Sequence, residues 1–87
     1  MSWHEKSFTY LAKNVKKYRK KLGLTQEKFA EVSNISRSYI SYIESETDHR
    51  SFSLEILFTL AEALGIPPHY LLDFTEYTES TEAKTNV

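Results

Sequence analysis

The sequence contains no cysteine, and only two glycines and two prolines among its 87 residues. Without cysteine, a disulfide framework, a thiolate metal site and a cysteine nucleophile are all excluded. Each glycine stands between a leucine and a further apolar residue, the pattern of a helix ending, so neither remains for a glycine-rich loop that would bind phosphate. We therefore expect a fold that is stabilised by packing alone.

Long apolar runs are also absent. No stretch reaches the roughly 18 uncharged residues of a membrane-spanning helix, and residues 1–6 lack the apolar centre of a signal peptide, so we expect a cytoplasmic protein. The three histidines, His4, His49 and His69, are too widely spaced to suggest a metal site. No strained nucleophile turn accompanies the serines. We expect no metal, no cofactor and no enzymatic activity.

The formal net charge is only −1, but the charges are segregated along the chain. Residues 1–50 carry ten Lys or Arg against six Asp or Glu, whereas residues 51–87 carry one against six. Six of the nine residues in 13–21 are basic. The first half therefore favours an anionic partner, and residues 75–87 are typical of an acidic, solvated tail.

Apolar residues recur at steps of three and four, which predicts an all-α protein without strands. Candidate N-caps precede four of the predicted helices, at Ser7, Thr25, Ser36 and Ser53. The predicted helices cover residues 7–22, 26–32, 37–44, 53–64 and 69–73. Their short connections predict a compact cluster of five helices rather than a long bundle.

The short helices 26–32 and 37–44 are joined by a tight turn, which predicts a helix-turn-helix. Once Ile40 and Ile43 are buried, the exposed side of helix 37–44 presents hydrogen-bonding residues and no acid before Glu44. Such a face suits insertion between rows of phosphates, although from these residues alone an ordinary solvated helix is an equal alternative.

Three runs carry a resemblance to a known family: LGLTQEKFA at 22–30, ISRSYISYIE at 35–44 and LFTLAEALG at 57–65. In this order and spacing, they resemble the lambda-repressor-like helix-turn-helix family of Cro and Xre type, over residues 8–74. The tripeptide at 37–39 is similar to that of restriction–modification controller proteins, and phage repressors are a further comparison. The resemblance implies a dimer that binds a two-fold operator in double-stranded DNA, with helix 37–44 in the major groove.

Roles for individual residues follow from this hypothesis. Arg37 is the first candidate for reading a base, because its guanidinium group matches O6 and N7 of guanine. Ser38 and Tyr42 are further candidates, and the Tyr42 ring could pack on a thymine methyl group. Gln26 starts the helix that crosses the DNA backbone, where its amide suits a phosphate oxygen. The candidates for phosphate contacts are Gln26, Ser36, Tyr39, Ser41, Lys17 and Lys28.

Two further groups of residues are predicted to be structural. Arg19 and Glu44 each intrude on an apolar helix face, which predicts a buried ion pair between them. The predicted dimerisation surface comprises Ile66, Tyr70, Leu71 and Phe74.

The expected organisation is a flexible N-terminal arm (1–6), a DNA-binding domain (7–74) and a disordered acidic tail (75–87). The loop 45–52 is longer and more acidic than the resemblance implies, which makes backbone contacts from it doubtful. The first hypothesis for the function is a transcriptional regulator. The alternative is a protein-interaction module of the same fold, such as an antitoxin or anti-regulator subunit, that binds a protein partner through its acidic C-terminal region.

Overall fold

The computed structural model describes residues 2–48 and 51–78, and all regular structure within these ranges is helical. The helices are α1 (Trp3–Lys21), α2 (Gln26–Ser33), α3 (Arg37–Ile43), α4 (Leu54–Leu64), α5 (Pro68–Leu71) and α6 (Thr75–Thr78). The first five correspond to the predicted helices, so the all-α class is confirmed. No helix in the described part of the chain is long and apolar enough to cross a membrane.

The start of α1 differs from the prediction. The helix begins at Trp3, because the Ser2 hydroxyl accepts a hydrogen bond from the amide of Glu5 while the Glu5 carboxylate reaches back to the amide of Ser2. This reciprocal capping box nucleates a turn before the first buried residue of the helix. Ser7 is therefore inside α1 rather than its cap, and residues 3–6 of the predicted arm are helical, while Met1 lies outside the described residues.

The predicted caps of α2, α3 and α4 are present. The hydroxyls of Thr25, Ser36 and Ser53 each accept a hydrogen bond from the amide three residues later. Each bond satisfies one of the amides that a helix start leaves without an intrahelical partner.

Gly23 ends α1 with a φ of 71°, in the left-handed conformation that side chains other than glycine rarely adopt. The next amide, that of Leu24, returns to the carbonyl of Arg19 at 3.2 Å. Gly65 ends α4 in the same conformation. Both endings agree with the leucine–glycine–apolar pattern in the sequence.

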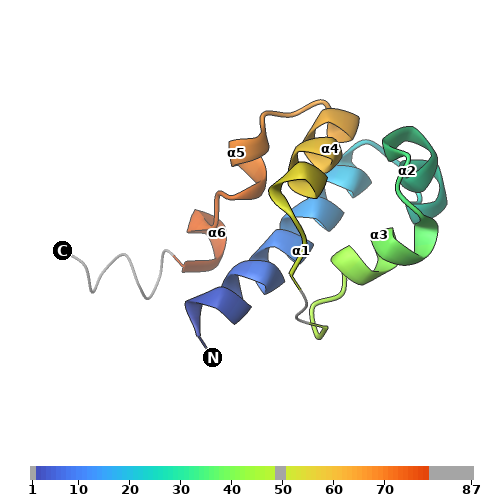
Figure 1. Cartoon of the computed structure of the whole chain (residues 1–87). Coiled ribbons are helices and arrows are strands. Elements are labelled where there is room, and N and C mark those ends of the chain that lie inside the picture. The colour runs from blue at the N-terminus through green and yellow to red at the C-terminus, as the bar shows by residue number, and fades with distance from the viewer. Residues whose placement is uncertain (1, 49–50, 79–87) are drawn as a thin grey trace.

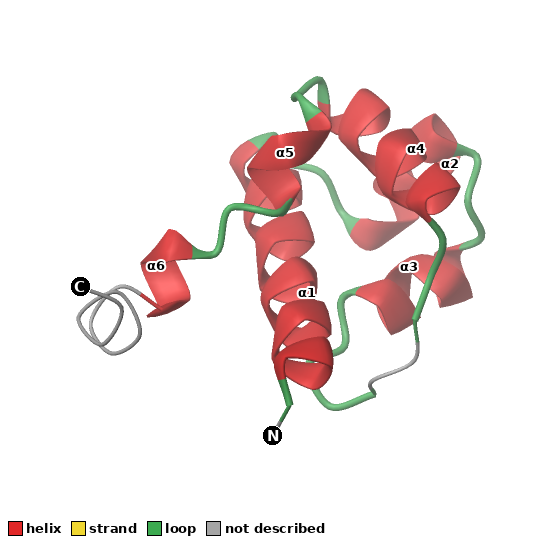
Figure 2. Cartoon of the chain, turned by 60° about the vertical axis from the view of Figure 1, so that its left-hand side comes forward, coloured by secondary structure: helices red, strands yellow, loops and turns green. Residues whose placement is uncertain are grey.

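In both views, α1 runs through the middle of the molecule, with α3 on one side and α6 on the other (Figures 1 and 2). The core lies where α1 meets α2 to α5, and burying each large side chain contributes about 1.5–3 kcal/mol. Its buried residues include Leu11, Val15, Phe29, Ile35, Ile40, Ile43, Leu57, Leu60, Leu64 and Leu71.

The C-terminal part of the described chain is more ordered than predicted. After α5, residues 75–78 form α6, although the acidic composition predicted a disordered tail from residue 75. Residues 79–87 of that predicted tail lie outside the described residues.

Candidate nucleic-acid interface

A tight turn connects α2 to α3. Asn34 adopts the left-handed conformation with a φ of 58°, which its short polar side chain tolerates. The amide of Ile35 then bonds to the carbonyl of Ala30 at 3.2 Å, and the Ile35 side chain is buried. The Ser36 cap starts α3 immediately afterwards. The predicted helix-turn-helix is therefore present, and its geometry is fixed by local hydrogen bonds.

The outward face of α3 carries no charged side chain except an arginine. Ile40 and Ile43 point into the core, whereas Arg37, Ser38 and Ser41 are exposed. The acid that follows, Glu44, is buried, so it adds no negative charge to this face. A helix of this kind can present a cation and hydroxyl donors to an anionic surface.

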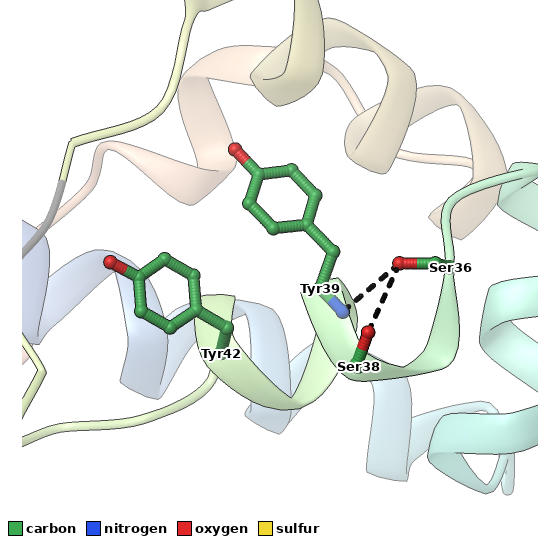
Figure 3. Close-up of a pocket in the computed structure, with 4 residues that line it drawn as sticks. All are labelled: Ser36, Ser38, Tyr39 and Tyr42. Carbon is green, nitrogen blue, oxygen red and sulfur yellow. Dashed lines mark hydrogen bonds between the residues drawn. The ribbon is translucent and has the colours of Figure 1, made fainter.

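A pocket opens on the same helix, lined by Ser36, Ser38, Tyr39 and Tyr42 (Figure 3). The Ser36 and Ser38 hydroxyls lie 3.5 Å apart, within hydrogen-bond range. The rings of Tyr39 and Tyr42 are stacked, with centroids 6.0 Å apart and an interplanar angle of 17°. Both tyrosines are half-buried, and the Tyr42 hydroxyl oxygen is buried. Tyr42 therefore offers its ring, rather than its hydroxyl, to the pocket.

Arg19 and Glu44 form the ion pair that the sequence predicts. Arg19 Nε donates to Glu44 Oε2 at 2.7 Å, and Nη2 donates to Oε1 at 3.0 Å, so the pair is bidentate. Only 8% of Arg19 and 2% of Glu44 are exposed. Arg19 Nη1 also donates to the carbonyl of Leu24 at 2.6 Å. These bonds tie the end of α3 to α1 and to the loop that leads into α2.

Gln26 extends this network. Its Nε2 donates to Glu44 Oε1 at 3.0 Å, so the side chain links the first residue of α2 to the end of α3. The sequence predicts only a phosphate contact for Gln26, and nothing in its spacing from Glu44 signals this second role. One hydrogen of the amide is engaged by Glu44, which leaves the other for a ligand.

Lysines 13, 16 and 17 of α1 are paired within the chain. Lys13 lies 3.2 Å and Lys16 3.8 Å from the carboxylate of Glu46, in the loop after α3. Lys17 donates to Glu76 of α6 at 3.0 Å. The hydrogen bond from Lys17 is the main reason that the pKa of the Glu76 carboxyl is lowered.

Comparison with known proteins places this geometry in a family. The family model described as helix-turn-helix matches residues 15–71, which include the helix-turn-helix and most of the core. The chain belongs to this helix-turn-helix family. It is of the Cro/Xre type that the sequence resembles. Membership also agrees with the prediction that the protein is not an enzyme.

Three relatives of this helix-turn-helix protein are named as control or controller proteins. The chain is 44% identical over 55 residues to control protein C.BamHI of Bacillus amyloliquefaciens, and 43% identical over 55 residues to control protein C.SmaI of Serratia marcescens. Each match covers 63% of this chain, and 65% and 63% of the respective relatives. The crystal structure of the restriction-modification controller protein C.AhdI from Aeromonas hydrophila matches 74% of this chain and 94% of its own, with 33% identity and a TM-score of 0.66.

The structure separates the predicted phosphate-contacting lysines of this helix-turn-helix protein. Lys28 is exposed on α2, where it lies 3.6 Å from Glu31. Lys17 is held by α6, on the side of α1 that is opposite α3 (Figures 1 and 2). Its position argues against the predicted contact between Lys17 and a phosphate.

The predicted dimerisation surface needs one correction. Leu71 is fully buried in the core of the single chain, so its inclusion in an exposed surface is wrong. Its neighbour Leu72 is 48% exposed, and Tyr70 is 43% exposed. Ile66 and Phe74 are half-buried against the core.

Asn14 anchors the C-terminal helices and was not predicted. It is fully buried; its Nδ2 donates to the carbonyls of Leu71 at 2.9 Å and Asp73 at 3.1 Å, and its Oδ1 accepts from the Tyr77 hydroxyl at 2.8 Å. The signal in the sequence was its position three residues after Leu11, within the apolar stripe of α1. A polar side chain at such a position requires hydrogen-bond partners.

Two titratable groups near Asn14 have shifted pKa values. Burial is the main cause that raises the pKa of Tyr77 to about 12, and the neighbouring Glu76 carboxylate adds to it. Hydrogen bonds from the Thr75 hydroxyl and amide lower the pKa of the Asp73 carboxyl. Within the described ranges, no group of His, Asp and Glu side chains is arranged to hold a metal ion.

Proposed function

We propose that the protein is a sequence-specific regulator of transcription that binds double-stranded DNA as a homodimer, with α3 in the major groove. The observation that carries this proposal is the outward face of α3, which combines an exposed arginine with serine hydroxyls and no exposed acid. Membership of the Cro/Xre-type family and the names of the control-protein relatives support it.

Arg37 is the proposed reader of a guanine. It occupies the first turn of α3, is exposed, and carries a planar group with paired donors that matches O6 and N7. Gln26, Ser41 and Lys28 lie on or beside the helix-turn-helix, and we propose that they contact phosphates. Ser36 and Tyr39, which also line the pocket, belong to the same set.

The proposed dimer uses the exposed residues around α5. Tyr70 and Leu72 present apolar area to solvent, and Ile66 and Phe74 lie at the edge of the core beside them. In the proposed two-fold dimer, the two copies of α3 enter successive major grooves on one face of the duplex. Sedimentation equilibrium tests this directly, and a protein that remains monomeric at high micromolar concentration would contradict the dimer.

The function is tested by selecting bound duplexes from a random pool at low salt and aligning the enriched sequences. We expect a two-fold symmetric site. Arg37→Ala should weaken binding to that site by about 1–3 kcal/mol and relax the preference at one base pair in each half. A folded protein that enriches no sequence and binds no duplex at low salt would refute the function and would favour a protein-interaction module.

A further inference from the structure

The pocket on α3 borders the outward face, to which its lining residue Ser38 belongs. In an α-helix, residues four apart share a side, and Ser38 and Tyr42 lie on the side opposite the buried Ile40 and Ile43. Figure 3 shows the two tyrosine rings along one flank of α3 and the two serine hydroxyls at its start. A ligand on this face would thus meet aromatic carbon and hydroxyl groups within one turn.

Two neighbouring hydroxyls, those of Ser36 and Ser38, lie at the start of this pocket. Ser36 Oγ accepts the amide of Tyr39 at 3.2 Å and lies 3.5 Å from Ser38 Oγ, where either hydroxyl could be the donor. When Ser36 is the donor of this pair, the exposed Ser38 hydroxyl keeps its own proton for a ligand. The pocket therefore combines a hydrogen-bond donor with an apolar wall.

Among the bases, thymine matches both features. Its major-groove edge presents the O4 acceptor beside the C5 methyl group, whereas cytosine presents a donor, and guanine presents acceptors but no methyl. We propose that this pocket reads a thymine in each half-site, with Ser38 donating to O4 and the Tyr42 ring contacting the methyl group. The inference rests on the proposed function and names the base that the pocket of α3 selects.

The experiment replaces thymines one at a time by deoxyuridine in the duplex that the selection yields. Deoxyuridine removes only the methyl group, so base pairing and O4 are unchanged. We expect one thymine per half-site at which this change weakens binding by about fourfold, the affinity equivalent of one buried methylene group. At the same position, Tyr42→Ala should reduce the difference between thymine and uracil to near unity. Tyr42→Phe, which keeps the ring, should preserve it.

Ser38→Ala provides a second test. Ser38 is exposed and does not belong to the core, so this substitution should leave the fold unchanged. This variant should lose the preference for thymine over 5-methylcytosine, which has the methyl group but presents a donor in place of O4. The proposal is overturned if no thymine is sensitive to loss of its methyl group. It is also overturned if Tyr42→Ala leaves that sensitivity intact, or, where this variant does not fold, if Ser38→Ala keeps the full preference. Failure of the selection itself would refute the DNA-binding function instead.

Discussion

Replacing Arg19 by alanine would remove three hydrogen bonds, two of them to a carboxylate that is 2% exposed. Gln26 would then be the remaining side chain that donates to Glu44 within the network described above. Breaking a buried pair on one side costs about 3–5 kcal/mol, because the other charge remains without its counter-ion. Since domains of this size are stabilised by only about 5–15 kcal/mol, the loss is a large part of the total.

Thermal unfolding followed by far-UV circular dichroism measures this effect. Each kcal/mol corresponds to roughly 4–8 °C in a domain of this size, so Arg19→Ala should melt at least about 12 °C lower or be unfolded at room temperature. Lys20→Ala, at the next and exposed position of α1, is the matched control and should shift the melting temperature little. The double variant Arg19→Met with Glu44→Met should recover much of the loss, because it leaves no buried charge. An Arg19→Ala variant that melts within a few degrees of wild type would refute this reasoning.

Three further predictions concern the polar contacts of α1. Tyr77→Phe removes the bond to Asn14 Oδ1 and should cost about 0.5–1.5 kcal/mol in a denaturant titration; no change would show that the bond contributes nothing. The pKa of Tyr77 is about 12 in the fold, against 10.0 for the ordinary phenol, so the contribution of Tyr77 to stability should be complete below pH 10 and fall as the pH rises through 12. The difference in absorbance at 295 nm between wild type and Tyr77→Phe follows the ionisation of Tyr77. A midpoint of that difference near pH 10 would contradict the raised pKa. Glu46→Gln removes the charge that faces Lys13 and Lys16, so the slope of log affinity for a non-specific duplex against log salt should steepen by up to about 0.9 per lysine released to a phosphate; an unchanged slope would show that these lysines do not reach DNA.

The helix-turn-helix was predictable because local signals specify it. Caps at Thr25 and Ser36 mark the two helix starts, and Gly23 marks the end of the preceding helix. The ion pair between Arg19 and Glu44 was also predictable, because a charge on an apolar stripe must find a partner when that stripe is buried. These features depend on spacing of three or four residues, which the sequence displays directly.

Two features of the helices were not predicted: the residue at which α1 starts, and which of the leucines at α5 faces the core. The reasons differ. The first turn of α1 buries no side chain, so apolar periodicity gives no sign of it; its local signal is the serine–glutamate capping box at Ser2 and Glu5. After two prolines, a helix of four residues is too short for periodicity to decide which leucine faces inward. The core takes Leu71 and leaves Leu72 exposed.

The order of residues 75–78 depends on contacts between residues about sixty positions apart, which no local pattern shows. Tyr77 stacks on Tyr10 at 5.0 Å and donates to Asn14, while Glu76 pairs with Lys17. An acidic segment with one large apolar residue is disordered by composition, but α1 supplies the aromatic surface and the polar partners that hold it. Tertiary contacts thus override the composition of the segment.

The buried polar residues of α1 also bear on how a dimer could match an operator. Arg19 holds the end of α3, and Asn14, on the same helix, holds the end of α5. Apolar contacts are non-directional and allow small sliding, whereas a bidentate ion pair and paired amide bonds fix position and orientation. The proposed DNA-reading helix α3 and the proposed dimer surface are therefore both attached to the same rigid helix, α1. Since half-sites must lie about one helical turn of DNA apart, this common attachment would set the spacing that a dimer accepts.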